Sequence, residues 1–382
     1  MFETSSIEIN QEAYRNNIEF IKNQCGPGVR FCSVVKGNAY GHGILTFVKM
    51  AIDVGVDYFA VYSTDEAYRI RSQISDQVDV MIMGNTDNQA LQWSIENGIE
   101  IFVFDLERLR QAIDFAKASN KKAKIHIEVE TGMNRTGFLL EQLQEVLKII
   151  KENDKHIDLI GFCTHYAGAE SLVNDFRVQQ QIQHFEEAKI MLANADLKAK
   201  YIHSACSAAM INYPETVGDL VRIGIMQYGF WPNEETLIRF NGHSRETDQT
   251  LKRLISWKSQ IMAVKKVMKG EFVGYNTSYQ AYADITIGVI PVGYAFGYSR
   301  SLSNSGKVLI RGVEAPICGI VNMNALCVDI THLPEVAKGD EVVLIGNQGD
   351  STITVASFGE MSNQLNYELL TRLPHDIPRK II

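Results

Sequence analysis

The chain has 382 residues, of which 46% are hydrophobic and 21% are charged, and its formal net charge is -8 at pH 7. This composition is ordinary for a globular protein with a sizeable core. Nucleic-acid-binding proteins usually carry a concentrated basic face, so we expect no nucleic-acid partner for this acidic chain.

The N-terminal stretch "MFETSSIEINQEAYRNN" has neither the basic segment nor the long apolar segment of a secretory signal. No part of the sequence approaches the roughly 20 uninterrupted apolar residues of a membrane span. The six cysteines are scattered without a CxxC pair, which predicts reduced thiols and no zinc site. We therefore expect a cytoplasmic protein without a membrane or metal partner.

From residue 11 to about residue 240, helical and strand-like segments alternate. The stretches "QEAYRNNIEFIKNQ" and "EQLQEVLKIIKEN" have the three-and-four apolar spacing of amphipathic helices. Short apolar runs lie between the helices: "RFCSVVK", "YFAVYS", "DVMIMG", "IEIFVF", "KIHIEVE", "DLIGFCTHY", "YIHSACS" and "LVRIGIM". Runs that are apolar on both faces and separated by helices are typical of a parallel sheet. Eight of them favour a closed (β/α)8 barrel of the TIM type, with an open doubly wound sheet as the alternative.

After about residue 245 the sequence changes to β-branched runs broken by Gly, Pro, Asn and Asp, such as "DITIGVIPVGY" and "DEVVLIG". Helical periodicity returns only in "TVASFGEMSNQLNYELLTRL". We predict a barrel domain at 1–240, and a mostly β domain at 241–382 with which a first strand at about 5–10 can pack. The polar stretch "GFWPNEETLIRFNGHSRETDQT" is the predicted irregular connector between the two domains.

Lys36 stands at the end of the first barrel strand, in "SVVKGNAYGHG". The carboxyl ends of barrel strands form the functional face, so its amine should point into the barrel mouth. Desolvation lowers the pKa of a lysine and makes the amine a usable nucleophile, for example toward a carbonyl group. A lysine paired with a barrel carboxylate is the structural alternative.

Other segments around the predicted barrel mouth could bind a phosphate group. Tyr40 lies four residues after Lys36, and Gly224 and Ile225 follow the last barrel strand in a turn whose N–H groups can face an anion. Ser207 lies at the end of the seventh strand. A lysine on the first strand and a late phosphate site together describe a pyridoxal 5'-phosphate pocket.

The motif "VVKGNAYGHG" resembles the cofactor-lysine signature of the alanine racemase family, with Gly37 where the family usually has alanine. Further segments resemble the family in the same order along nearly the whole chain: "IEINQEAYRNN", "VETGMNRTGF", "GFCTHYAGAES", "VRIGIMQYG", "VGYNTSYQA", "IPVGYAFGY", "VNMNA" and "LNYELLTRLPHDIPR". The resemblance implies a (β/α)8 barrel followed by a β domain. It also implies a head-to-tail homodimer in which the partner's C-terminal domain completes each active site.

Racemisation requires one group to remove the α-hydrogen and another to return a hydrogen to the opposite face. By the resemblance, Lys36 is the Schiff-base lysine that serves the D-amino acid, and Tyr275, from the partner subunit, serves the L-amino acid. His165 and Arg222 match the pair behind the cofactor ring. Arg222 should hydrogen-bond the pyridine nitrogen, and because an arginine does not readily give up a proton, the ring stays unprotonated.

The resemblance also implies how the substrate and the phosphate are held. Arg135 matches the arginine that contacts the substrate carboxylate, and Met323 matches the partner residue whose backbone helps to hold it. Five residues match the phosphate ligands of the family: Tyr40, Ser207, Gly224, Ile225 and Tyr367.

The chain departs from the family pattern at the position that usually carries a carbamylated lysine, where it has Glu128. A glutamate supplies the negative charge without carbon dioxide, so we predict that Glu128 pairs with Arg135 and replaces the carbamate. The other departures are Cys206, Phe296, Ile320, Asn322 and Asn324. Several of these line or adjoin the substrate channel of the family, which leaves the identity of the amino acid open.

The sequence therefore predicts a pyridoxal-phosphate amino-acid racemase, most simply an alanine racemase that makes D-alanine for bacterial cell-wall peptidoglycan. A racemase of serine or of broader range is the first alternative. A decarboxylase or aldolase is less consistent with Arg222, because related decarboxylases tend to place an acid at the ring nitrogen. A non-catalytic cofactor carrier is less consistent with the second domain and with Tyr275.

Overall fold

The computed structural model describes residues 3–74, 76–243, 251–333, 335–356 and 366–382. The described chain divides into two compact units, which are considered separately. One unit contains residues 12–37 and 48–253, and the other contains residues 1–11, 38–47 and 254–382.

The first unit is a nearly closed parallel barrel. Its strands are β2 (Arg30–Val34), β3 (Tyr58–Val61), β4 (Asp79–Ile82), β5 (Glu100–Val103), β6 (Ala123–Glu128), β7 (Ile157–Cys163), β8 (Tyr201–His203) and β9 (Leu220–Ile223). They pair in the order β8-β7-β6-β5-β4-β3-β2-β9, and each named ladder is parallel. Between β8 and β9 a single parallel bridge joins Cys206 to Arg222 and brings the two ends of the sheet together. The predicted (β/α)8 architecture is confirmed.

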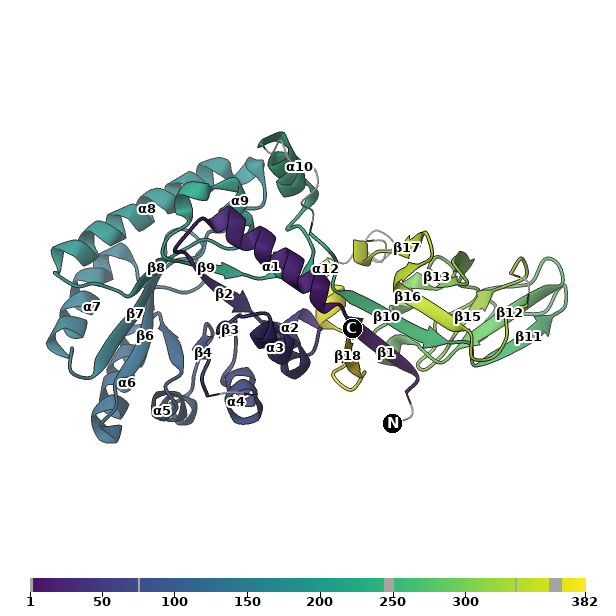
Figure 1. Ribbon diagram of the computed structural model, residues 1–382, viewed down its shortest axis with the longest axis horizontal. Coiled ribbons are helices and arrows are strands. Elements are labelled where there is room, and N and C mark those ends of the chain that lie inside the picture. Colours follow the sequence, from purple (N-terminus) through teal and green to yellow (C-terminus); the bar gives the residue numbers. More distant parts are fainter. Residues whose placement is uncertain (1–2, 75, 244–250, 334, 357–365) are drawn as a thin grey trace. The chain divides into compact units, whose positions relative to one another are not determined.

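Helices surround the barrel strands (Figure 1). They are α1 (Gln11–Cys25), α3 (Ile44–Asp53), α4 (Thr64–Gln73), α5 (Asn88–Glu96), α6 (Leu106–Ser119), α7 (Leu140–Glu152), α8 (Asp175–Asn194), α9 (Ser207–Asn212) and α10 (Glu234–His243). The short segment α2 (Lys36–Tyr40) follows β2 directly, and the 3-10 turns η1 (Leu172–Asn174), η2 (Pro214–Thr216) and η3 (Ile225–Tyr228) complete the connections. All residues of β3, β5 and β9 are buried, as expected for strands covered on both faces.

Part of the predicted irregular connector is helical, which corrects the sequence interpretation. Helix α10 lies within it, and its Phe240 ring packs edge-on against Phe20 of α1, with the ring centroids 5.3 Å apart. Trp231 completes this aromatic cluster at 5.2 Å from Phe240. Because most residues of the segment are polar, the sequence interpretation missed the few apolar residues that pack this helix. Residues 244–250 of the connector lie outside the described part of the chain.

The second unit is mostly β. Its strands are β1 (Ser5–Ile9), β10 (Ile255–Gln260), β11 (Ala263–Val267), β12 (Ile285–Ile290), β13 (Lys307–Ile310), β14 (Val313–Pro316), β15 (Leu326–Asp329), β16 (Glu341–Gln348), β17 (Ser351–Ile353) and β18 (Arg379–Ile381), with η4 (Tyr294–Phe296), η5 (Arg300–Leu302) and helix α12 (Asn366–Thr371). One sheet has the order β14-β13-β16-β10-β1-β18, with β17 beside β16, and a second has the order β11-β12-β15. The predicted mostly β second domain is confirmed.

The N-terminal strand belongs to this second unit and not to the barrel. Strand β1 pairs antiparallel with β10 and parallel with β18. Its residues alternate between buried and half-buried positions, so that Ile7 and Ile9 face the core. On the other face, the Lys258 amine lies 2.9 Å from Glu8 and 3.2 Å from Glu341, which links β1, β10 and β16.

Candidate active site

Lys36 follows β2 and begins α2, at the carboxyl end of the barrel strands. Burial lowers the pKa of Lys36, and the positive charge of Arg135 lowers it further. A lowered pKa increases the fraction of neutral amine at neutral pH, and the neutral amine is the form that attacks a carbonyl carbon. The environment of Lys36 therefore suits a nucleophile.

The backbone after Lys36 turns in the left-handed sense. The φ angles of Gly37, Asn38, Ala39 and Tyr40 are 63°, 56°, 54° and 49°. For non-glycine residues this region costs about 1–2 kcal/mol each. Local bonds offset the cost, among them a 2.9 Å bond from the Ile44 N–H to the Asn38 side chain. Strained turns of this kind persist where the surrounding structure fixes them, often at functional sites.

The strand that leads to Lys36 is tied to the turn after β9. The carbonyl of Val34 accepts hydrogen bonds from the Gln227 amide and from the Tyr228 hydroxyl, both at 3.0 Å. Ser33 adds a 2.6 Å bond from its hydroxyl to the Gln227 side-chain oxygen. All these groups are buried, so the position of β2 relative to η3 is well fixed.

The predicted phosphate ligands of the barrel lie at the ends of neighbouring strands. Ser207 begins α9 after β8, and Gly224 follows β9 directly, with Ile225 beginning η3. The Gly224 N–H donates to the Ser207 hydroxyl at 3.2 Å. A hydroxyl and adjacent backbone N–H groups make a donor set that suits a phosphate group.

Arg222 is buried in β9 and held from several sides. Its NH1 donates to the ring nitrogen Nδ1 of His203 and, at 3.2 Å, to the His203 carbonyl. Its NH2 donates to the carbonyls of Thr164, at 2.7 Å, and Ser204, at 3.4 Å. Within the residues that the structure describes, the Nε of Arg222 has no protein acceptor. One N–H of a fixed guanidinium therefore remains for a ligand acceptor such as a ring nitrogen.

His165 follows β7 on the same side of the barrel. Burial lowers its pKa to about 3, and the positive charges of Arg222 and Arg135 contribute to the shift. The imidazole is therefore neutral at physiological pH. A neutral ring beside a guanidinium adds no further positive charge, which is compatible with its predicted place behind a cofactor ring.

Glu128 ends β6 and is buried. Burial raises its pKa, opposed by a hydrogen bond with Thr136 and by the charges of Arg222 and Arg135. Among the described residues no ion pair joins Glu128 to Arg135, so the predicted direct pair is not formed and Arg135 acts on Glu128 at longer range. The backbone of the Arg135 loop is instead held by Glu130, which accepts the Arg135 N–H at 3.2 Å and the Gly132 N–H at 2.5 Å.

The four remaining predicted residues belong to the second unit. The rings of Tyr40 and Tyr367 lie 6.0 Å apart, so these two predicted phosphate ligands are neighbours. Tyr275 and Met323, which the resemblance assigns to the partner's active site, are 72% and 55% exposed. Exposure leaves both side chains accessible to a second subunit.

Sequence reasoning missed several polar residues of the barrel interior. Glu100, His126 and His203 are buried on β5, β6 and β8, and they connect to Arg222 through hydrogen bonds. Glu100 is the single charged residue of the run "IEIFVF", whereas His126 and His203 lie among other polar residues in "KIHIEVE" and "YIHSACS". That signal was present, but the sequence gives no strand register with which to place them together.

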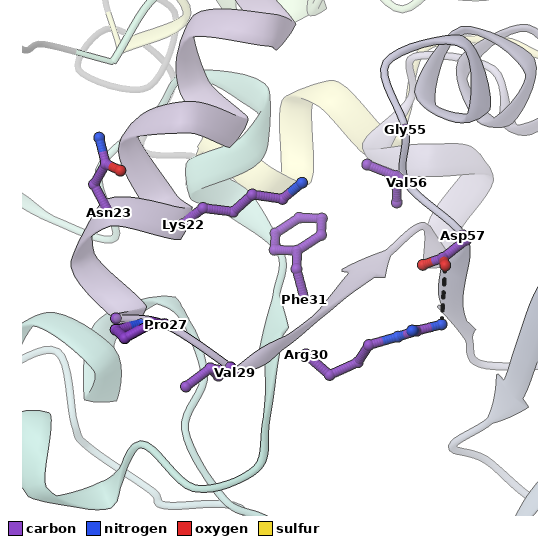
Figure 2. Close-up of a pocket in the computed structure, with 11 residues that line it drawn as sticks. Lys22, Asn23, Pro27, Val29, Arg30, Phe31, Gly55, Val56 and Asp57 are labelled. Atoms are coloured by element: carbon purple, nitrogen blue, oxygen red, sulfur yellow. Dashed lines mark ion pairs between the residues drawn. The ribbon is translucent and has the colours of Figure 1, made fainter.

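A hollow of about 560 Å³ lies at the opposite end of β2 from Lys36, lined by Lys22, Arg30, Phe31 and Asp57 among others (Figure 2). In Figure 2 Arg30 reaches toward Asp57, and the two form an ion pair at 3.1 Å. Arg30 also lies 3.4 Å from Asp79. Its charge is already balanced by protein carboxylates, so this hollow does not resemble an anion site.

In the part of the chain that the structure covers, no group of three or more His, Cys, Asp or Glu side chains is arranged to hold a metal ion. No helix among the described residues is both long and apolar enough to cross a membrane.

Family models match most of the chain. The model described as "Alanine racemase, N-terminal domain" matches residues 9–232, and "Alanine racemase, C-terminal domain" matches residues 254–381. The alanine racemase of Leptospira interrogans is 32% identical over 99% of this chain and 96% of its own length. That of Clostridium perfringens is 33% identical over 97% of this chain and 94% of its own length.

Solved structures agree with this result. The alanine racemase of Clostridium difficile 630 superimposes with a TM-score of 0.90 at 29% identity, covering 100% of this chain and 96% of that one. The Bacillus anthracis enzyme with bound L-Ala-P gives a TM-score of 0.89 at 30% identity, covering 100% and 96%. A histidine racemase from Leuconostoc mesenteroides gives a TM-score of 0.89 at 25% identity, covering 100% of this chain and 98% of that one.

Proposed function

Because the chain belongs to the alanine racemase family, we propose that this amino-acid racemase interconverts L-alanine and D-alanine with pyridoxal 5'-phosphate as its cofactor. The observation that carries the proposal is the half-buried Lys36, whose amine has a lowered pKa, in the same barrel as Arg222 and the Ser207–Gly224 contact. When bound, the cofactor supplies an aldehyde that links to amines and a ring that withdraws electrons from the α-carbon.

The donor set of the barrel fits this cofactor. Lys36 Nζ would hold the aldehyde, and Arg222 Nε would donate to the ring nitrogen. The Ser207 hydroxyl and the N–H groups of Gly224 and Ile225 would bind the phosphate, together with Tyr40 and Tyr367. Because the guanidinium remains protonated, it would leave the ring nitrogen of the bound cofactor unprotonated. His165 would lie behind the ring as a neutral imidazole.

Inversion at the α-carbon requires two acid–base groups on opposite faces. We assign these roles to Lys36, which exchanges a proton with the D-amino acid, and to Tyr275 of the partner subunit, which exchanges one with the L-amino acid. The functional unit is then a homodimer in which Tyr275 and Met323 reach the partner's barrel. The exposure of both side chains is consistent with this assignment.

Glu128 would supply a fixed negative charge in the region of Arg135, which binds the substrate carboxylate. In Glu128→Gln the amide keeps the size of the side chain and can still accept from Thr136, but the charge is lost. We expect KM for alanine to rise by about threefold to tenfold, because a charge of this kind contributes on the order of 1 kcal/mol, with a smaller change in kcat. Steady-state kinetics in both directions measure the change.

Steady-state kinetics also test whether Glu128 takes the place of the carbamylated lysine of the family. Wild-type activity should not respond to added bicarbonate, because a glutamate needs no carbon dioxide to carry its charge. A sharp rise in wild-type activity with bicarbonate, or an unchanged KM in Glu128→Gln, would contradict the role assigned to Glu128.

The experiment that tests the proposed function is a chiral assay of the purified protein over a panel of L-amino acids with pyridoxal phosphate added. We expect D-alanine to form with the highest kcat/KM. Absence of any D-amino acid, with the cofactor bound, would contradict a racemase.

A second candidate is a racemase of another amino acid on the same scaffold. It is favoured by the substitutions Cys206, Phe296, Ile320, Asn322 and Asn324, and by the similarity to a histidine racemase. In the panel, a higher kcat/KM for serine or for a larger amino acid than for alanine would select this candidate.

A further inference from the structure

A chain of buried polar side chains runs through the barrel interior to Arg222. The Tyr58 hydroxyl contacts the Glu100 carboxylate, and His126 Nε2 lies 2.9 Å from the same carboxylate oxygen. His126 Nδ1 lies 2.9 Å from Nε2 of His203, whose Nδ1 accepts from Arg222. These residues come from β3, β5, β6, β8 and β9. The chain therefore crosses the barrel from a carboxylate to a guanidinium.

The direction of every hydrogen bond in the chain follows from its two ends. A guanidinium can only donate, so His203 Nδ1 must accept and its proton must sit on Nε2. That proton is donated to His126 Nδ1, so His126 carries its proton on Nε2. An ionised carboxylate can only accept, and Glu100 accepts from His126. Both histidines are thus held neutral in one tautomer while the chain is intact.

The local environment supports this arrangement of charges. Burial alone would raise the pKa of Glu100, but hydrogen bonds from His126 and Tyr58 outweigh it and hold the pKa below the ordinary value, so the carboxylate is ionised. Burial and the charge of Arg222 hold the pKa of His203 well below the ordinary value, so it is neutral. One negative and one positive charge remain, connected through two neutral rings.

The packing around the two histidines leaves room for this contact. Gly161 of β7 lies against both rings, and a Cβ built there would be 1.9 Å from His126 Nδ1 and 2.6 Å from His203 Nε2. The Phe102 ring stacks on His126 with the centroids 5.4 Å apart, and the Arg222 guanidinium carbon lies 6.0 Å from the same ring. Gly161 and the ring of Phe102 thus pack against the hydrogen-bonded side chains from two sides.

We propose that Glu100 and His126 are positioning residues for Arg222, which act through His203 and fix how the guanidinium faces the cofactor ring. This inference rests on the proposed function, because it assigns the remaining N–H of Arg222 to the ring nitrogen. Glu100 balances the guanidinium charge across the barrel, and the donor chain prevents NH1 from rotating toward the ligand. Arg222 thereby presents Nε in a single orientation.

The first test uses the wild-type protein without cofactor. In 15N NMR spectra of protein labelled at histidine, His126 and His203 should each show one protonated nitrogen, at Nε2, and one unprotonated nitrogen, at Nδ1. Protonation of either residue at both nitrogens, or at Nδ1 alone, would contradict the inferred direction of the hydrogen bonds between Glu100 and Arg222. This readout does not depend on catalysis, so it separates failure of the chain from failure of the proposed function.

The second test compares Glu100→Gln with a control variant outside the hydrogen-bonded chain. Glu100→Gln removes the charge but keeps an acceptor for His126, whereas Tyr213→Phe removes another buried tyrosine hydroxyl that donates to a carboxylate, that of Asp175 at 3.0 Å. For Glu100→Gln we expect the affinity for pyridoxal phosphate and kcat to fall by about tenfold, comparable to the loss when a partner that supports a metal-ligating side chain is removed. For Tyr213→Phe we expect both quantities to stay close to the wild-type values.

Spectra of the variants without cofactor complete the comparison. The Hε2 proton of His126 should resonate downfield in wild type and in Tyr213→Phe, and move upfield in Glu100→Gln, because the charge-assisted bond is lost. A merely structural role would lower activity in both variants in proportion to their melting temperatures. That result, or Glu100→Gln with wild-type cofactor affinity and kcat, would overturn the proposal. If Glu100→Gln does not fold, the tautomers of the wild-type protein still decide it.

Discussion

Replacement of Lys36 by alanine is expected to leave a folded protein that cannot hold pyridoxal phosphate covalently and has lost racemase activity by on the order of a thousandfold or more. The physical reason is that the amine serves twice, as the attachment point of the cofactor and as one of the two bases. Its burial and the nearby charge of Arg135 favour the neutral, reactive form. Alanine has no group that can take over either role.

Borohydride reduction followed by peptide mass spectrometry measures the attachment. Wild-type protein should carry the reduced cofactor on the peptide that contains Lys36, and Lys36→Ala should carry none. Lys22→Ala is the matched control, because Lys22 is an exposed lysine of α1, and it should be labelled like wild type. Cofactor found on another lysine of the wild-type protein would contradict the assignment.

Replacement of Tyr275 by phenylalanine is expected to abolish interconversion while leaving cofactor attachment intact. We expect a loss of racemisation on the order of a thousandfold. Proton exchange should be lost only on the face of the α-carbon that Tyr275 serves, because the remaining base, Lys36, still exchanges a proton with D-alanine. In heavy water, Tyr275→Phe should therefore incorporate deuterium at the α-carbon of D-alanine with retention, and leave L-alanine unlabelled.

Proton NMR with chiral separation of the products measures both exchanges. Tyr282→Phe is the matched control, because Tyr282 is another exposed tyrosine of the second unit, at 78% exposure, and it should racemise like wild type. Equal loss of exchange from both enantiomers in Tyr275→Phe would contradict the two-base assignment. A cofactor carrier without catalysis would show no difference between the variant and wild type.

Much of the barrel could be predicted from the sequence because its strands are short apolar runs at regular intervals. β3 is buried throughout, and its run is accordingly apolar with no alternation. α7 could be predicted because one of its faces carries Leu143, Val146, Leu147 and Ile150, all buried. α10 was missed because only a few apolar residues, such as Phe240, anchor it in a polar segment.

The polar contacts of the site were harder to predict than its residue types. Motifs named Glu128 and Arg135, but the sequence alone does not give side-chain distances, and Glu128 interacts most closely with Thr136. Glu130, which holds the Arg135 loop, lies inside the motif "VETGMNRTGF", but the motif assigned it no role. The chain from Glu100 to Arg222 depends on the register of strands far apart in sequence, which no local pattern specifies.

The most direct measurement of the central claim mixes Lys36→Ala and Tyr275→Phe subunits, each inactive alone, under conditions in which subunits exchange. If Tyr275 acts in the partner's barrel, every mixed dimer contains one site with both bases intact. Racemase activity should then return to about a quarter of the wild-type value, since half of the dimers are mixed and each has one working site of two. Mixed dimers that form, as seen by native mass spectrometry, but show no activity would contradict an active site shared between subunits.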